Sequence, residues 1–222
     1  MNHLLSKIGS YPFEKLNLLH RDIKPSKEVI NLSIGEPKLN ADSKVLDILN
    51  KETNSFSNYP PMNAVPELSE AYRQYLKNHF GIENVAEDEV CLVAGTREGT
   101  FSIIQALFNK ENVKEKPYVV MPNPFYQIYG GATTLAGGEA KFLDCPEEDN
   151  FQPDLDSLKS EDWQKCQILV LCSPNNPTGS VLPLSKLKNI LDLAEKYDFY
   201  VVSDECYVCL LYTSDAADDR LR

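Results

Sequence analysis

Residues 168–179 read ILVLCSPNNPTG, an apolar run followed at once by a loop rich in turn-forming residues. A second apolar run that ends in acidic side chains, FYVVSDECY, occupies residues 199–207. Between the two runs, residues 184–197 have apolar side chains at helical spacing, namely Leu187, Ile190, Leu191 and Ala194. Continuous apolar runs joined by a helix are typical of parallel strands that are covered on both faces.

The same alternation of strand and helix patterns begins near residue 89. Strands are expected at residues 90–94, 118–121, 140–143, 168–172 and 199–203, with helices at 97–109, 125–136 and 184–197. The sequence therefore predicts a three-layer α/β/α domain with a mostly parallel sheet. The preceding chain is predicted to form an arm and part of a small domain, with helices at about 41–51 and 67–80.

Composition excludes several classes of protein. The chain has 222 residues, enough for one substantial domain, and its 42% hydrophobic and 25% charged residues exclude a disordered chain. Its net charge of −11 repels nucleic acids and acidic lipid surfaces, so neither is an expected partner. No apolar run is long enough for a signal peptide or a membrane span. Together with six scattered cysteines, expected to be reduced, this favours a cytoplasmic protein without a metal site.

Ligands of parallel sheets bind where the strands end, and four loops there carry polar or aromatic side chains. The glycine turn and helix start at Thr96 and Arg97 could bind a phosphate group through backbone N–H groups. Tyr126 lies in a proline-rich aromatic loop, and residues 173–179 contain adjacent asparagines. Asp204 ends an apolar strand, a costly place for a carboxylate that lacks a partner.

Each of these loops also has a plain structural explanation, as a helix start, aromatic core packing or a turn. Asp204 and Glu205 could alternatively hold Mg²⁺ in a nucleotide hydrolase, although the chain lacks the glycine-rich patterns of dinucleotide-binding and P-loop proteins. Cys206 and Cys209 have the spacing of a redox pair, but a single such pair is weak evidence.

Taken together, these motifs resemble the fold-type I pyridoxal 5′-phosphate (PLP)-dependent aminotransferases of class I/II. The resemblance covers about residues 1–207 and rests on residues 11–16 (YPFEKL), 32–38 (LSIGEPK), 95–98 (GTRE), 122–129 (PNPFYQIY), 173–179 and 203–207. Within that family, the motifs are most similar to succinyl-diaminopimelate aminotransferases of the bacterial lysine pathway. The implied fold is the PLP-binding major domain, in incomplete form.

The resemblance implies roles for residues around the cofactor ring. Asp204 would pair with the pyridinium nitrogen, which lets the ring accept electrons when the substrate Cα loses its proton. Tyr207 and Asn176 would hydrogen-bond the 3′ oxygen of the ring, and Asn176 would also belong to the substrate site. Tyr126 would stack on the face of the ring.

Other residues of the resemblance would hold the phosphate and the substrate. Thr96 and Arg97 would bind the cofactor phosphate, with Glu98 as a further candidate. Gly35 would contact the substrate α-carboxylate through its backbone. Tyr59 would reach the cofactor phosphate of a neighbouring subunit, which implies a homodimer with shared active sites.

One required residue is absent from the expected place. The family uses a lysine beyond the strand that ends at Asp204 to form a Schiff base with PLP, but the last lysine here is Lys196. We therefore expect the chain to be the N-terminal fragment of an aminotransferase for amino-acid biosynthesis, with little turnover of succinylated diaminopimelate and 2-oxoglutarate. The predicted segments are an arm and small-domain part at 1–50, the PLP-binding domain at 51–207 and a non-native tail at 208–222.

Two alternatives remain open within the resemblance. The missing lysine is also what a non-catalytic PLP-fold binding protein would show. Related aminotransferases that act on aspartate, alanine or aromatic amino acids share most of the same motifs, so these substrates remain alternatives to succinylated diaminopimelate.

Overall fold

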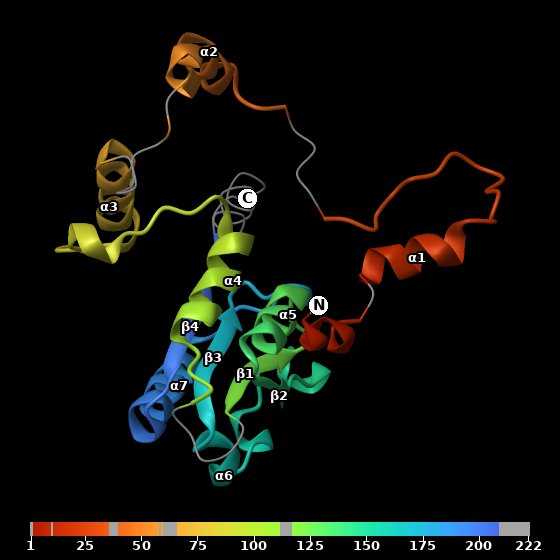
Figure 1. The fold of residues 1–222 in the computed structure, drawn as a ribbon, viewed down its shortest axis with the longest axis vertical. Helices are drawn as coiled ribbons and strands as arrows, with labels where there is room; N and C mark the ends of the chain where they lie inside the picture. The colour runs from red at the N-terminus through yellow and green to blue at the C-terminus, as the bar shows by residue number, and fades with distance from the viewer. Residues whose placement is uncertain are drawn as a thin grey trace, which may run out of the picture. The chain divides into compact units, whose positions relative to one another are not determined.

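The computed structural model describes residues 2–9, 11–35, 40–57, 59, 66–111 and 117–208. The chain divides into two compact units. Residues 11–92 form the N-terminal unit, and residues 1–10 together with 93–222 form the sheet unit. Figure 1 shows that the strands found among the described residues all belong to the sheet unit.

The N-terminal unit consists of helices joined by irregular chain. Its elements are α1 (Pro12–His20), α2 (Ser43–Lys51), α3 (Pro66–Phe80) and the 3₁₀ turns η2 (Thr53–Ser57) and η3 (Glu87–Glu89). The Asp42 carboxylate explains where α2 begins, because it accepts a hydrogen bond from the backbone N–H of Lys44 at 2.8 Å. The helices predicted at 41–51 and 67–80 are confirmed as α2 and α3.

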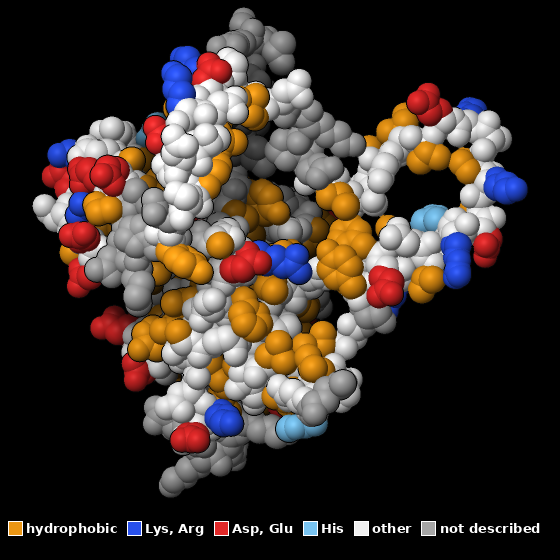
Figure 2. Space-filling model, turned by 45° about the horizontal axis from the view of Figure 1, so that its top comes forward, with side chains coloured by type: hydrophobic (Ala, Val, Ile, Leu, Met, Phe, Trp, Pro, Cys, Tyr) orange, Lys and Arg blue, Asp and Glu red, His pale blue; other side chains and the backbone are white. Residues whose placement is uncertain are grey.

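Many apolar side chains of the N-terminal unit are exposed. Ser69 is the one residue described in this unit that is buried, whereas Ile30 and Leu32 are 81% and 86% exposed. Figure 2 shows apolar side chains at the molecular surface among the acidic and basic ones. Burial of apolar surface is the main source of folding free energy, so the described part of this unit lacks a core of its own.

The sheet unit contains a four-stranded sheet with helices around it. Its strands are β1 (Tyr118–Asn123), β2 (Glu139–Asp144), β3 (Cys166–Cys172) and β4 (Tyr200–Asp204), in the order β2-β1-β3-β4. All three neighbouring pairs are parallel, which confirms the predicted parallel α/β sheet. Its helices and turns are η1 (His3–Lys7), α4 (Thr96–Leu107), α5 (Gln127–Ala136), η4 (Glu147–Asp149), η5 (Leu155–Ser157), α6 (Ser160–Trp163) and α7 (Leu184–Tyr197).

Both faces of the sheet are covered, which produces the predicted three layers. Successive side chains of a strand point to opposite faces, so the apolar runs supply two separate cores. One core joins Val119 and Met121 of β1 to Ile104 of α4 and to α5. The other core joins Val120 of β1 to Ile190 of α7 and to the end of α6.

The prediction of a strand at residues 90–94 is wrong. The segment forms no β-ladder in the structure, and Val93 is half exposed. An apolar run becomes a strand only beside a partner that completes its backbone hydrogen bonds, and no described strand pairs with this segment. Helix α5 also begins at Gln127 rather than at residue 125, which leaves Tyr126 at its N-cap.

Two sequence predictions lie outside the described residues. Cys209, which the predicted redox spacing with Cys206 requires, lies outside the described residues. So does the predicted tail at 208–222, apart from its first residue. The five cysteines that the structure describes are free thiols. Across the described residues, no helix combines the length and the apolar character that a bilayer crossing requires.

The strand order creates a natural place for a ligand. The chain leaves β1 for β2 on one side and later returns to β3 on the other side of β1. The loops that follow β1 and β3 therefore diverge at the carboxyl edge of the sheet, where parallel sheets of this kind bind ligands. Tyr126 follows β1, Asn176 follows β3 and Asp204 ends β4, so all three lie at this edge.

Candidate functional site

A cavity of about 110 Å³ opens at the carboxyl edge of the sheet. Its lining comes from the start of α4, the start of α5 and the loops after β3 and β4, and consists of Thr96, Arg97, Tyr126, Tyr129, Asn176, Asp204, Cys206 and Tyr207. The structure thus brings together six residues that the sequence analysis had named. It adds Tyr129 and Cys206, to which the sequence analysis gave no role in the site.

Asp204 lies where β4 ends, in register with Cys172 of β3. Its Oδ2 accepts a hydrogen bond from the Tyr129 hydroxyl at 2.7 Å, and its Oδ1 accepts one from the backbone N–H of Cys206 at 3.2 Å. These donors offset the cost of holding a carboxylate at the end of an apolar strand. They also fix the direction in which the carboxylate faces.

Tyr129 is fully buried on α5 and is the main residue that the sequence analysis missed. Burial, reinforced by the hydrogen bond to Asp204, raises the pKa of the Tyr129 hydroxyl far above its usual value, so the group stays a proton donor. Its spacing of three residues from Tyr126 could have revealed it, because such a pair shares one side of a helix start. The two rings meet edge to face, with centroids 5.7 Å apart.

Asn176 and Tyr207 form a second polar pair in the cavity. The Asn176 side-chain amide donates to the Tyr207 hydroxyl oxygen at 3.2 Å, although the residues come from different strand ends. Burial raises the pKa of Tyr207, and the nearby Cys206, Cys172 and Asp204 raise it further. An amide N–H and a phenolic O–H placed side by side can both donate to one ligand oxygen.

The start of α4 has the features of an anion site. Gly95 precedes the helix with φ of 108°, a conformation that favours glycine, and no side chain caps the helix. The first N–H groups of the helix are therefore available to a ligand, together with the positive end of the helix dipole and Arg97. Glu98 is not among the lining residues, and its carboxylate folds back toward Gly95.

Gly35 and Tyr59 belong to the N-terminal unit and are not among the residues that line the cavity. Both are exposed. The roles that the resemblance implies for them remain predictions.

The alternative Mg²⁺ site does not form among the described residues. Glu205 is exposed, accepts a hydrogen bond from the Ser203 hydroxyl at 2.9 Å and does not line the cavity with Asp204. The part of the chain that the structure describes contains no group of three or more His, Cys, Asp or Glu side chains that could hold a metal ion. This geometry offers no support for the nucleotide hydrolase.

The polar groups of the cavity fit PLP. A carboxylate suits a protonated pyridine nitrogen, the Asn176–Tyr207 pair suits a phenolic oxygen, and the uncapped start of α4 suits a phosphate group. Tyr126 supplies an aromatic ring in the same cavity. No lysine is among the described residues that line it.

Cys206 provides a test of the electrostatics of the cavity. The side chain is exposed, but partial burial and a hydrogen bond to the Asp204 carboxylate raise the pKa of its thiol to about 12. The thiol is therefore neutral at pH 8. We expect iodoacetamide to alkylate Cys206 about fifty-fold more slowly than a free thiol with an ordinary pKa, after allowing for the greater nucleophilicity of a more basic thiolate.

Mass spectrometry of the peptide that contains Cys206 would measure this rate. The same cysteine in the urea-unfolded chain is the matched control, because unfolding removes the carboxylate and the burial. The rate in the folded chain should rise steadily from pH 7 to pH 10. A plateau near pH 9 would contradict the raised pKa.

Comparisons with known proteins agree with this geometry. A family model described as "Aminotransferase class I and II" matches residues 27–221. Aspartate aminotransferase of Pyrococcus horikoshii is 30% identical over 199 residues, which cover 89% of this chain and 49% of the relative. LL-diaminopimelate aminotransferase 2 of Nostoc sp. is 28% identical over 212 residues, which cover 94% of this chain and 53% of the relative.

A solved structure shows the same fold. The crystal structure of an aminotransferase from Neisseria meningitidis matches with a TM-score of 0.85 and 41% sequence identity, over 93% of this chain and 52% of that chain. The present chain thus spans about half the length of the relatives that it matches.

Proposed function

Because the chain belongs to the class I and II aminotransferases, we propose that the protein transfers an amino group between an amino acid and a 2-oxo acid, with PLP as cofactor. The observation that carries this proposal is that an oriented carboxylate, an amide–phenol pair and an uncapped helix start line one cavity. When bound, PLP supplies a sink for the electrons that remain after a substrate Cα loses its proton.

The residues of the cavity have distinct tasks in this proposal. Asp204 holds a proton on the ring nitrogen, and Tyr129 keeps the carboxylate facing that nitrogen through its 2.7 Å hydrogen bond. Asn176 and Tyr207 donate to the phenolic oxygen and stabilise its negative charge. Tyr126 covers a face of the ring.

The other end of the cavity binds the phosphate. Thr96 and Arg97 hold it at the start of α4, where backbone N–H groups and the helix dipole attract a dianion even though the chain as a whole is acidic. Gly35 as a substrate contact and Tyr59 as a contact across a homodimer complete the proposal, on the strength of the sequence motifs. A cytoplasmic location is proposed from the composition and the scattered cysteines.

We propose N-succinyl-LL-diaminopimelate as the amino donor and 2-oxoglutarate as the acceptor, which places the protein in lysine biosynthesis. The motif resemblance supports this choice, as does the similarity to a relative named for LL-diaminopimelate. Aspartate remains the alternative that a second relative suggests. Calorimetric titration of the PLP-loaded chain with these donors, and with alanine and aromatic amino acids, would rank their affinities; equal affinities for all of them would overturn the assignment.

Cofactor binding tests the function directly. Pyridoxamine 5′-phosphate is the suitable probe, because it has no aldehyde that could react with surface lysines. We expect it to bind at least about ten-fold more tightly than pyridoxamine, since only the phosphorylated compound uses the start of α4. Calorimetric titration measures both affinities. Equal binding of the two compounds, or saturable binding of ATP–Mg²⁺ in their place, would contradict the proposal.

A further inference from the structure

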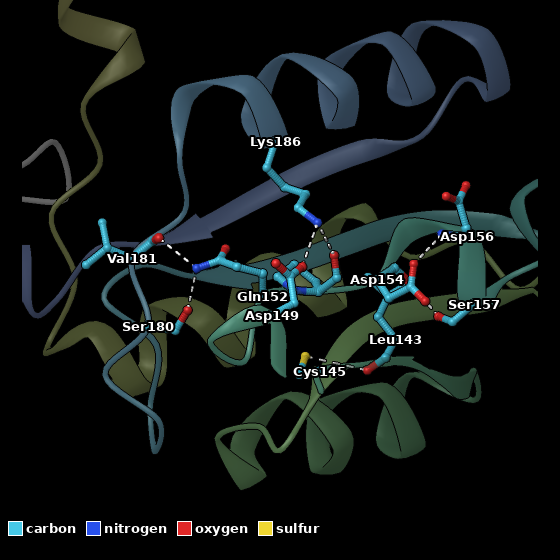
Figure 3. A network of polar contacts seen from close by, with 11 residues as sticks. Leu143, Cys145, Asp149, Gln152, Asp154, Asp156, Ser157, Ser180, Val181 and Lys186 are labelled. Carbon is cyan, nitrogen blue, oxygen red and sulfur yellow. Dashed lines mark hydrogen bonds and ion pairs between the residues drawn. The ribbon is translucent and has the colours of Figure 1, made fainter. Parts of the chain in front are cut away.

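The loop that carries Asn176 is held in place by another loop of the sheet unit. We call residues 173–182, which follow β3, the asparagine loop, and residues 145–157, which follow β2, the bracing loop. Figure 3 shows the polar network between them, with Gln152 of the bracing loop pointing toward Ser180 and Val181. Gln152 does not line the cavity, so it acts on a ligand only through the asparagine loop.

The bracing loop presents Gln152 in a defined position. Asn150 and Phe151 have φ of 52° and 57°, and the backbone N–H of Phe151 donates to the oxygen of Pro146 at 2.9 Å. The left-handed region is unfavourable for phenylalanine, so the turn is retained at a conformational cost. It reverses the chain immediately before Gln152.

Helix α7 secures the same turn from the other side. The Lys186 ammonium group donates to the backbone oxygen of Pro153 at 3.1 Å and lies 3.5 Å from the Asp149 carboxylate. Figure 3 shows Lys186 extending from α7 toward these residues. Gln152 is thus flanked by residues that are both tied to a helix of the core.

The amide group of Gln152 bonds to two acceptors of the asparagine loop. Its Nε2 donates to the Ser180 hydroxyl oxygen at 2.6 Å and to the backbone oxygen of Val181 at 2.9 Å. A backbone carbonyl can only accept, so the contact with Val181 requires the NH₂ group on this side. The Gln152 Oε1 atom is buried without a hydrogen-bond partner among the described residues, so the two donor contacts of Nε2 are the side-chain hydrogen bonds that orient Gln152.

Ser180 transmits this contact to the residue before Asn176. Its backbone oxygen accepts a hydrogen bond from the N–H of Asn175 at 2.8 Å, and the N–H of Gly179 donates to the oxygen of Asn175 at 2.7 Å. The asparagine loop is therefore closed at its base by the pairing of Asn175 with Ser180. A shift of Ser180 would move Asn175, and with it the amide of Asn176 that faces Tyr207.

We propose that Gln152 is a positioning residue for the phenolic oxygen of the cofactor, because its contacts with Ser180 and Val181 determine where Asn176 presents its amide. The inference rests on the proposed function. It adds a residue on a different loop, outside the cavity, that selectively strengthens one of the contacts between protein and cofactor.

The test compares two ligands with two variants. The ligands are pyridoxamine 5′-phosphate and an analogue that lacks the 3-hydroxyl group. Gln152→Leu retains the approximate size of the side chain and removes both donors. We expect this variant to bind pyridoxamine 5′-phosphate about five-fold more weakly and to bind the analogue as the unaltered chain does. Asn176→Ala should show the same selectivity, and combining both changes should add little to Asn176→Ala alone, since both act on one contact.

A spectroscopic readout separates positioning from general loosening. The ultraviolet absorption of the bound ligand reports ionisation of its 3-hydroxyl group, which a well-placed Asn176 amide promotes by donating to the anion. In Gln152→Leu, that ionisation should therefore require a higher pH. If Gln152 had only a structural role, Gln152→Leu would weaken the binding of both ligands equally and leave the ionisation of the 3-hydroxyl group unchanged. That result would overturn the proposal.

Controls keep the result interpretable. Gln164→Leu changes an exposed glutamine beyond the end of α6 and should alter neither affinity. If Gln152→Leu does not fold, Ser180→Ala removes one of the two acceptors and should show a smaller loss with the same selectivity; no selectivity there would also overturn the inference. If the unaltered chain binds neither ligand, the proposed function fails and the inference fails with it, whereas normal binding without selectivity refutes only the role of Gln152.

Discussion

Asp204→Asn is expected to weaken binding of pyridoxamine 5′-phosphate about thirty-fold. The change preserves the shape of the side chain, and an amide oxygen can still accept the hydrogen bond from Tyr129. The amide is neutral, however, so it cannot hold a proton on the pyridine nitrogen as a carboxylate does. A hydrogen bond between charged groups contributes about 2 kcal/mol, which corresponds to this loss of affinity. Calorimetric titration at neutral pH measures it.

Asp192→Asn is the matched control, because it removes the same charge from an exposed position on α7. It should leave the affinity unchanged, which would exclude an effect of net charge alone. If Asp204→Asn bound the ligand as tightly as the unaltered chain, the carboxylate would not face the ring nitrogen, and the proposed arrangement of the cofactor would be wrong.

Tyr129→Phe is expected to lower the free energy of unfolding by about 2 kcal/mol. The ring is fully buried and its packing survives the change, but Asp204 loses its shortest hydrogen bond. A bond from a neutral donor to a charged acceptor typically contributes about 1.5–3 kcal/mol, and a half-buried carboxylate has little water to replace it. Urea unfolding of Tyr129→Phe and of the unaltered chain measures the difference in free energy of unfolding. Affinity for pyridoxamine 5′-phosphate should fall as well, because the carboxylate is no longer held toward the ligand.

The difference in free energy of unfolding between Tyr129→Phe and the unaltered chain depends on pH, because the pKa of the Tyr129 hydroxyl is raised in the folded chain. Burial raises the pKa of the hydroxyl in the folded chain above its unfolded value of about 10. The associated stability is therefore fully present below about pH 10 and is lost as the pH rises further, because the unfolded chain then releases the proton more readily. Tyr200→Phe, at an exposed position of β4, should show no such loss of stability. An equal loss in both variants would contradict the role of Tyr129.

The sheet was predictable from the sequence for a specific physical reason. Parallel strands that are buried on both faces require continuous apolar runs, and the runs at 118–121, 140–143, 168–172 and 199–203 all became strands. The run at 90–94 is also apolar, but no described strand pairs with it. Apolar content is a property of one segment, whereas a strand requires two.

The site was predictable only in part. Motifs after strands and at a helix start located Thr96, Arg97, Tyr126, Asn176, Asp204 and Tyr207, which line one cavity. The spacing from Tyr126 places Tyr129 on the same side of a helix start, but it does not by itself assign a role in the site, because an aromatic residue there equally indicates core packing. Its hydroxyl reaches Asp204 across a sequence separation of 75 residues. Likewise, nothing local to Gln152 points to Asn176.

The amino-acid sequence by itself determined the layered fold, the loops that carry the chemistry and the resemblance to a family, because local periodicity and motif spacing encode these features. Only the tertiary structure decided which side chains support the site from outside those motifs. Contacts such as Tyr129 with Asp204 and Gln152 with Ser180 join segments that are distant in sequence. Such contacts depend on strand order and on how the loops at the carboxyl edge close on one another, and neither property is encoded in any single stretch of the chain.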